Sequence, residues 1–244
     1  NNKSIRKMRG LLKITKKPVF MIAVPTTCGT GSECTVASVV TDLERNEKYA
    51  INDPKLIPQY AVLDPKTLLT LPKHLIATTA LDALTHAIEA YIGKSNTENT
   101  KSHAGSAIHE IMENLIDAYN YPQDLELLAV LQKASYDAGI AFTKAYVGYV
   151  HAFSHAISAY YHLPHGYLNG VLLPIILEEY GNSINKELID FNDICSINSN
   201  NPSECMTDFS KSTNNLISII FTILGGIFAV IGFFNIVKIH KRIK

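Results

Sequence analysis

Short apolar runs separated by turn-forming residues mark the first part of the chain. Residues 18–24 form an apolar run that ends at Pro25, and residues 35–41 and 61–63 repeat this pattern after turns rich in Gly, Thr, Ser, Asp or Pro. Apolar runs of this length between turn signals are typical of buried strands. The pattern therefore predicts α/β structure over residues 1–70.

Apolar and small residues recur at helical spacing from Pro72 onward. The predicted helices are residues 76–92, 100–119, 125–139, 146–161 and 172–180. Gly93 stands where a left-handed residue commonly ends a helix, and Leu163-Pro164 should break the chain between two helices. Residues 192–215 are rich in Asn and Ser and predict a loop. We therefore expect an all-helical segment over residues 71–205.

The last segment, residues 206–244, differs in composition from the rest. Residues 216–237 carry no charge, and Lys and Arg follow directly. A bilayer core needs about 20 apolar residues, so this run is a candidate transmembrane helix. Two other interpretations stay open: the product of a shifted or fused reading frame, and a buried helix pair that breaks at Gly225-Gly226.

The overall composition excludes some classes of function. The chain has 244 residues and no formal net charge, with 47% hydrophobic and 18% charged residues. These proportions allow a hydrophobic core and remove any compositional case for nucleic-acid binding. Four cysteines without C-x-x-C spacing favour reduced thiols, and the first residues lack the apolar segment of a signal peptide. We expect a cytoplasmic protein, or alternatively one anchored in a membrane through residues 216–237.

Several histidines and one aspartate have the spacing of metal ligands. Asp82 and His86 stand four residues apart, as do His151 and His155, so each pair shares one face of a helix. His165 follows Pro164, where we expect a turn. One Asp-x-x-x-His pair is common by chance, but the later histidines strengthen the case. One carboxylate and three imidazoles suit Fe²⁺ or Zn²⁺ rather than Mg²⁺ or Ca²⁺.

Three motifs in order identify a family resemblance. Residues 25–33 read Pro-Thr-Thr-Cys-Gly-Thr-Gly-Ser-Glu, and residues 82–91 read Asp-Ala-Leu-Thr-His-Ala-Ile-Glu-Ala-Tyr. Residues 148–155 and 163–166 supply Gly-Tyr-Val-His-Ala-Phe-Ser-His and Leu-Pro-His-Gly. These motifs resemble the cofactor loop and the two metal-ligand signatures of the iron-containing (group III) alcohol dehydrogenases. The resemblance runs from about residue 10 to about residue 205.

The resemblance implies both an architecture and a reaction. Residues 1–70 would be part of an NAD(P)-binding α/β domain and residues 71–205 a truncated all-α metal-binding domain, as in the dehydroquinate synthase-like architecture. The intact family is expected to form a homodimer that transfers hydride between NAD(P) and an alcohol or aldehyde. Fe²⁺ is the implied metal, with Zn²⁺ as an alternative.

The motifs also imply individual site residues. The implied metal ligands are Asp82, His86, His151 and His165. His155 would relay a proton or place the substrate. The implied cofactor residues are Thr26, Thr27, Gly29, Thr30 and Lys48.

The chain also departs from the family pattern. The Gly-Gly-Gly-Ser pyrophosphate loop is absent from the sequence, and the apolar run 216–237 stands where the family has further helices. We therefore favour a gene fragment over a membrane anchor and expect weak NAD(P) binding. Other interpretations are a non-catalytic metal-binding remnant, a membrane-tethered structural protein, and an enzyme of the related glycerol dehydrogenase or dehydroquinate synthase type.

Overall fold

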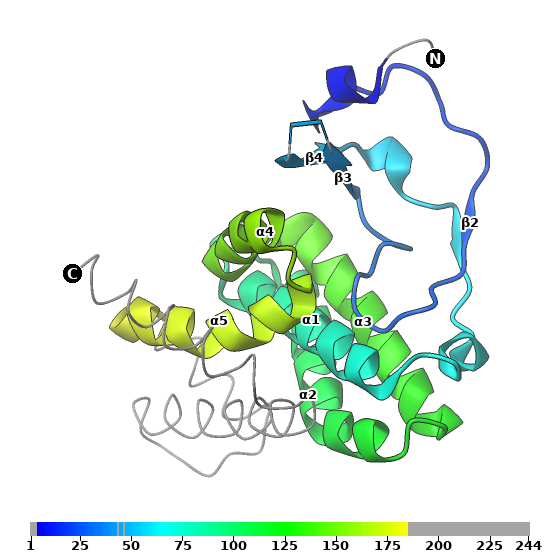
Figure 1. Cartoon of the computed structure of the whole chain (residues 1–244), viewed down its shortest axis with the longest axis vertical. Helices are drawn as coiled ribbons and strands as arrows, with labels where there is room; N and C mark the ends of the chain where they lie inside the picture. Colours follow the sequence, from blue (N-terminus) through cyan, green and yellow to red (C-terminus); the bar gives the residue numbers. More distant parts are fainter. Residues whose placement is uncertain (1–3, 43, 46, 185–244) are drawn as a thin grey trace.

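The computed structural model describes residues 4–184 except 43 and 46. Its strands are β1 (Gly10–Leu11), β2 (Ile22–Ala23), β3 (Ala37–Asp42), β4 (Glu47–Asn52) and β5 (Tyr60–Ala61). Its α-helices are α1 (Lys73–Ile92), α2 (Glu98–Asn120), α3 (Leu125–Ala145), α4 (Tyr149–Tyr161) and α5 (His165–Tyr180). A small strand-bearing part is thus followed by a larger helical part (Figure 1), which confirms the predicted fold class.

The strands form two small sheets. The first has the order β1-β4-β3, in which β1 runs parallel and β3 antiparallel to β4, with Val39 opposite Ala50. The second pairs β2 with β5 in parallel. Strand β4 was not predicted, although Tyr49 and Ile51 are buried on alternate positions of it.

The predicted strand over residues 18–24 is wrong in its extent. Only Ile22–Ala23 pairs, with β5, whereas Val19 and Phe20 are 85% and 66% exposed. An apolar run becomes a strand only where a neighbour accepts its backbone hydrogen bonds, and the described residues supply one for this short stretch alone. The predicted strands 35–41 and 61–63 are also displaced, to Ala37–Asp42 and Tyr60–Ala61.

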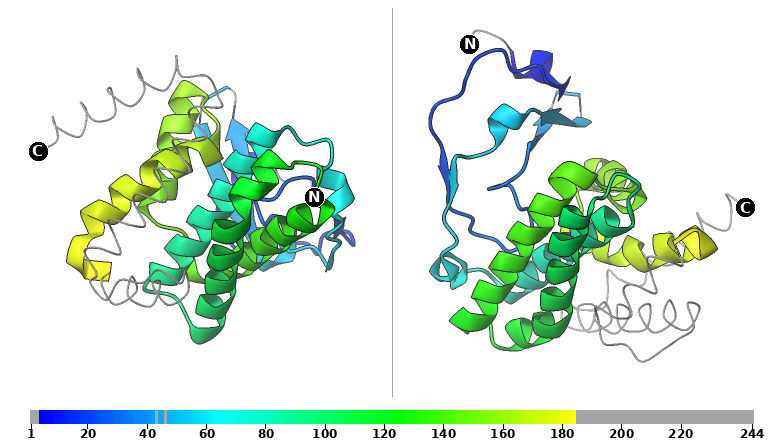
Figure 2. Two further views of the ribbon diagram at one scale, coloured as in Figure 1. Left: turned by 90° about the horizontal axis from the view of Figure 1, so that it is seen from below. Right: turned by 180° about the vertical axis from the view of Figure 1, so that it is seen from behind.

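Helix α1 is the centre of the helical part. It contacts α2, α3, α4 and α5 (Figures 1 and 2), and nearly every side chain from Ile76 to Tyr91 is buried. Small residues such as Ala80, Ala83 and Ala87 allow neighbouring helices to approach it from several sides. Asp82 and His86 therefore lie in a rigid, surrounded element.

The helix ends follow from local side chains. Thr97 and Thr100 form a capping box at the start of α2, and Asp124 accepts two backbone N–H bonds at the start of α3. Gly93 ends α1 in an extended rather than a left-handed conformation. A glycine is needed at this position because a Cβ would lie only 2.9 Å from the Glu89 carbonyl oxygen.

The membrane prediction falls outside the described residues. None of the helices between residues 4 and 184 combines the length and the apolar character needed to cross a bilayer. Residues 216–237 are not among the described residues, and neither is any other part of the predicted 206–244 segment. The division at residues 70 and 205 stays a prediction.

Candidate active site

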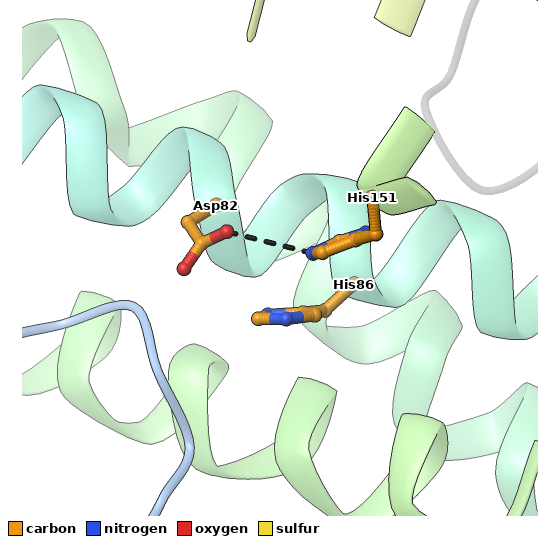
Figure 3. Close-up of side chains that lie close together, drawn as sticks. All are labelled: Asp82, His86 and His151. Carbon is orange, nitrogen blue, oxygen red and sulfur yellow. Dashed lines mark ion pairs between the residues drawn. The ribbon is translucent and has the colours of Figure 1, made fainter. Parts of the chain in front are cut away.

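Asp82, His86 and His151 come together inside the helical part. Each offers one ligand atom within 4.8 Å of the other two, and all three residues are buried. Figure 3 shows Asp82 and His86 on neighbouring turns of α1, with the His151 ring from α4 stacked over His86. The distance from Asp82 Oδ1 to His151 Nε2 is 3.5 Å. Helical i, i+4 spacing and the crossing of α4 over α1 thus gather three donors.

His165 lies beside this group at the first residue of α5. Its Nε2 is 3.7 Å from Asp82 Oδ1. The expected turn is therefore wrong, because Pro164 is the N-cap of a helix that begins at His165 itself. The next residue, Gly166, explains this close approach, because a Cβ there would overlap the Thr78 carbonyl oxygen of α1. Three helices, rather than two helices and a loop, therefore supply the four predicted ligands.

Two side chains that the sequence analysis missed hold the outer imidazole nitrogens. Glu89 Oε2 lies 2.6 Å from His151 Nδ1, while Glu89 Oε1 accepts the Val150 N–H at 2.7 Å. Ser154 Oγ lies 2.7 Å from His165 Nδ1. Hydrogen bonds of this kind fix the orientation and tautomer of a ligand histidine and leave Nε2 directed toward the cation. Glu89 stands seven residues after Asp82, a helical spacing that could have identified it.

Two further residues in contact with the cluster were also missed. Phe142 of α3 stacks on His86 with ring centroids 4.2 Å apart, and His151 stacks on the other side at 4.3 Å. Asn169 of α5 is fully buried and donates from Nδ2 to Asp82 Oδ1 at 2.6 Å. Asn169 stands one helical turn after His165, so its spacing was readable as well.

The protonation of the cluster follows from burial and from neighbouring charge. Burial lowers the pKa of His86 to about 3 and, with less burial, that of His165 to about 4. Burial also lowers the pKa of His151, but Asp82 and Glu89 outweigh it and raise the value to about 9. Burial acts to raise the pKa of Asp82, yet the nearby imidazoles of His86 and His151 hold it below its usual range. Asp82 is therefore an anion near neutral pH.

His155 lies one turn beyond His151 and outside the group of close donors. Its ring stacks on His165 with centroids 4.3 Å apart and is 6.3 Å from the His151 ring. Burial, followed by the charge of His151, lowers the pKa of His155. The role expected from the resemblance stays a prediction, but His155 is placed next to the donors without joining them.

A cavity of about 820 Å³ opens over the cluster and extends to the first sheet. Its lining includes Asp82, His86, His151, His155 and His165 from the helices. Leu11, Leu12, Val36 and Val39 line the sheet side, so most of the opposite wall is apolar. Strand β4 contacts α4, which brings the sheet to this position (Figure 1).

The predicted cofactor turn borders the same cavity in part. Thr30 and Ser32 line it, whereas Thr26 and Thr27 are not among its lining residues. Gly29 fits the turn against α1, because a Cβ would overlap the Thr79 carbonyl oxygen. Gly31 has φ +56° and a Cβ there would lie 2.7 Å from Gly139 Cα of α3. Glycines therefore bring this turn close to the metal ligands.

Lys48 makes a contact that the sequence did not predict. Its Nζ donates to Ser158 Oγ of α4 at 3.0 Å. The lysine therefore links the first sheet to α4. A contact with a cofactor ribose would have to be made in addition to this bond or in its place.

The helical unit with its carboxylate–imidazole cluster, next to a small α/β part, has the architecture of metal-dependent dehydrogenases. Residues 76–222 match the Fe-containing alcohol dehydrogenase family, C-terminal, and residues 1–65 match the description iron-containing alcohol dehydrogenase. The chain belongs to the iron-containing alcohol dehydrogenase family. The matched residues extend beyond the expected range of 10 to 205 and include the first residues of the apolar run.

Individual relatives agree with this assignment. Alcohol dehydrogenase 4 of Saccharomyces cerevisiae is 40% identical over 178 residues, which are 73% of this chain and 47% of that protein. An alcohol dehydrogenase from Oenococcus oeni superposes with a TM-score of 0.86 at 30% identity, over 90% of this chain and 58% of that one. Sulfoacetaldehyde reductase from Bifidobacterium kashiwanohense, in complex with NAD⁺, gives 0.82 at 26% identity over 90% and 57%. The chain thus spans about half the length of its relatives.

Proposed function

We propose that this chain is the metal-binding part of an oxidoreductase that transfers hydride between NAD(P) and an alcohol or aldehyde. The observation that carries the proposal is the convergence of Asp82, His86, His151 and His165 at the floor of one cavity. The oxygen of Asp82 is 3.5 Å from one imidazole nitrogen and 3.7 Å from another. Ligand bonds of roughly 2.0–2.2 Å to one ion separate donors by a little more than 3 Å.

The donor set fits a divalent first-row cation. One carboxylate and three imidazoles suit Fe²⁺, and Zn²⁺ as well. Glu89 and Ser154 hold the outer nitrogens of His151 and His165, as expected for ligands rather than for isolated buried histidines. When bound, such a cation supplies a Lewis acid that polarises a substrate oxygen.

In the proposed reaction, the protein supplies orientation and a proton acceptor. His155 borders the cavity and its pKa is lowered, so at neutral pH it is uncharged and able to accept a proton from an alcohol or to pass it on. The apolar wall formed by residues such as Leu11 and Val39 would exclude water from the reacting carbon. Asp82 and the three imidazoles would hold the cation next to the oxygen end of the substrate.

The nucleotide is assigned to the Gly- and Thr-rich turn. Thr26, Thr27, Gly29, Thr30 and Lys48 are proposed cofactor residues, with Thr30 nearest the cavity. Exposed amides and hydroxyls of such a turn can hydrogen-bond ribose or phosphate oxygens. The NAD⁺ named for the Bifidobacterium kashiwanohense relative supports a nicotinamide cofactor. A cytoplasmic location and a homodimer of the intact protein belong to the same proposal.

A second candidate function is metal binding without turnover. The exposure of Val19, Phe20 and Ile22, at 85%, 66% and 54%, favours it. Neighbouring exposed apolar side chains mark a surface that another part normally covers, so we infer that this α/β part would hold a nucleotide weakly. The two candidates share the metal centre and differ in NAD(P) binding.

Metal analysis and nucleotide titration together test the proposal. The 244-residue chain, purified without oxygen, should contain close to one equivalent of Fe²⁺ or Zn²⁺. Asp82→Ala and His151→Ala should each lose it, whereas His74→Ala on the surface of α1 should retain it. NADH fluorescence and alcohol oxidation then separate the two candidates. Full metal content in Asp82→Ala would exclude the proposed centre.

A further inference from the structure

One buried amide lies among the donor atoms themselves. The side chain of Asn169 is fully buried, and its Nδ2 donates to Asp82 Oδ1 at 2.6 Å. The same Nδ2 is 3.1 Å from His151 Nε2 and 3.3 Å from His165 Nε2. Within the described residues, Asn169 Oδ1 has no hydrogen-bond partner. A single amide nitrogen is thus in contact with three of the four proposed ligands.

An amide nitrogen has only two hydrogens for these three neighbours. The bond to Asp82 is the shortest and is charge-assisted, so it is the strongest of the three. A carboxylate oxygen has two lone pairs, so Asp82 Oδ1 can accept from Asn169 and still face a cation. The remaining N–H points toward the two imidazole nitrogens. The amide nitrogen therefore lies close to the anionic oxygen and to both ring nitrogens.

The orientation of the Asp82 carboxylate matters because its oxygen lies close to two imidazole nitrogens. Asp82 Oδ1 and His151 Nε2 are already 3.5 Å apart, and Asp82 Oδ1 and His165 Nε2 are 3.7 Å apart. Without the amide, the carboxylate would lose its shortest hydrogen bond and could rotate away from this arrangement. A cation would then have to restore the arrangement before all of the donors could bind it.

We propose that Asn169 is a positioning residue of the metal centre. Its amide holds the Asp82 carboxylate in its ligand orientation, next to His151 Nε2 and His165 Nε2, before the cation binds. This inference rests on the proposed metal centre. It assigns to Asn169 a function that packing alone does not explain, because a buried amide with an unpartnered oxygen is less stable than an apolar side chain of similar shape.

The chain offers a matched control at Gln132. This residue is also a buried amide with an unpartnered oxygen, and its Nε2 donates to the Pro25 carbonyl at 3.2 Å. Its bond holds the chain before the cofactor turn to α3 and involves none of the proposed ligands. Gln132→Leu therefore removes an amide of the same kind without touching the metal centre.

The test measures the affinity of the chain for Co²⁺, a spectroscopic substitute for Fe²⁺ and Zn²⁺. Metal-free protein is titrated with Co²⁺ against a competing chelator, and the visible absorption of the bound ion is recorded. Asn169→Leu should weaken binding about 10- to 100-fold, the usual effect of losing a partner of a ligand, and should change the absorption spectrum. Gln132→Leu should bind within about twofold of the original chain. If Asn169→Leu does not fold, Asn169→Ala replaces it with the same expectation.

The outcomes separate this inference from the proposed function. Binding by Asn169→Leu within about twofold of the original chain, with an unchanged spectrum, would overturn the positioning role and leave the metal centre intact. Equal weakening by Gln132→Leu would also overturn it, because the effect would then be a general loss of stability. Failure of the unsubstituted chain to bind Co²⁺, Fe²⁺ or Zn²⁺ would overturn both.

Discussion

Glu89→Gln tests how the site holds its most buried histidine. In the structure the two carboxylate oxygens of Glu89 accept from different donors, His151 Nδ1 at 2.6 Å and the Val150 N–H at 2.7 Å. Glutamine has nearly the same shape but only one acceptor oxygen. Its NH₂ group must then face one of the two donors, which leaves that donor unpaired in a buried place.

The magnitude follows from these two contacts. A hydrogen bond to a charged group contributes about 1.5–3 kcal/mol, so we expect Glu89→Gln to lower the free energy of unfolding by roughly this amount. Metal affinity should fall about 10- to 100-fold, because the His151 ring loses the partner that fixes its tautomer. In the metal-free protein, the pKa of His151 should fall from about 9, since one of the two carboxylates that outweigh its burial is removed.

Three measurements check this prediction. Denaturant unfolding gives the stability, Co²⁺ titration gives the affinity, and the NMR shifts of the His151 ring give its pKa. Glu33→Gln is the control, because Glu33 is also buried but its Oε2 has no partner among the described residues. That control should leave the metal affinity unchanged. A Glu89→Gln protein with the original affinity and an unshifted His151 pKa would refute the assigned role of Glu89.

Two further predictions concern acid and packing. The metal-free protein should lose stability as the pH falls from about 6.5 toward 4, because burial lowers the pKa of His86 to about 3 and that of His165 to about 4. In this window the unfolded chain binds protons that the folded chain does not. The free energy of unfolding therefore falls by up to about 1.4 kcal/mol per pH unit for each imidazole. Equal unfolding midpoints at pH 7 and pH 5 would contradict this prediction. Gly139→Ala should destabilise by about 1–3 kcal/mol although alanine normally favours a helix, because its Cβ would lie 2.5 Å from Cys34 Sγ and 3.0 Å from Gly31 Cα. Thermal unfolding of the Gly139→Ala protein measures this effect. A raised melting temperature would contradict the prediction and show that the facing turn moves at little cost.

The sequence predicted best the positions of residues that lie near their partners along the chain. Asp82 and His86 share a helical face through their spacing alone, and that helix was predicted from small and apolar residues at helical spacing. The position of His151 could not be predicted from spacing, since only the crossing of α4 over α1 brings it within reach of Asp82. The motif order supplied that information through the family resemblance. The spacing alone did not.

Other features depend on contacts that no local pattern contains. The extent of a strand is set by its neighbour, so the apolar run 18–24 was predicted longer than the two paired residues of β2, and the polar-looking β4 was missed. Glu89 and Asn169 stood at readable helical spacings. Which ring nitrogen or carboxylate oxygen each one reaches is decided by the packing of α4 and α5 on α1.

The proposed metal centre and the proposed cofactor turn are brought together by close backbone approach rather than by shared side chains. The proposed ligands and the three side chains that hold them come from α1, α4 and α5, and the turn enters the same cavity through Thr30 and Ser32. Gly29 allows the cofactor turn to pack closely against α1, and Gly31 allows it to pack closely against α3. Gly166 allows the start of α5 to pack closely against α1. At each position a Cβ would overlap or crowd the facing backbone, so a larger residue would change how closely these segments pack. The distance between the two proposed sites is therefore encoded in glycines that take no part in the chemistry.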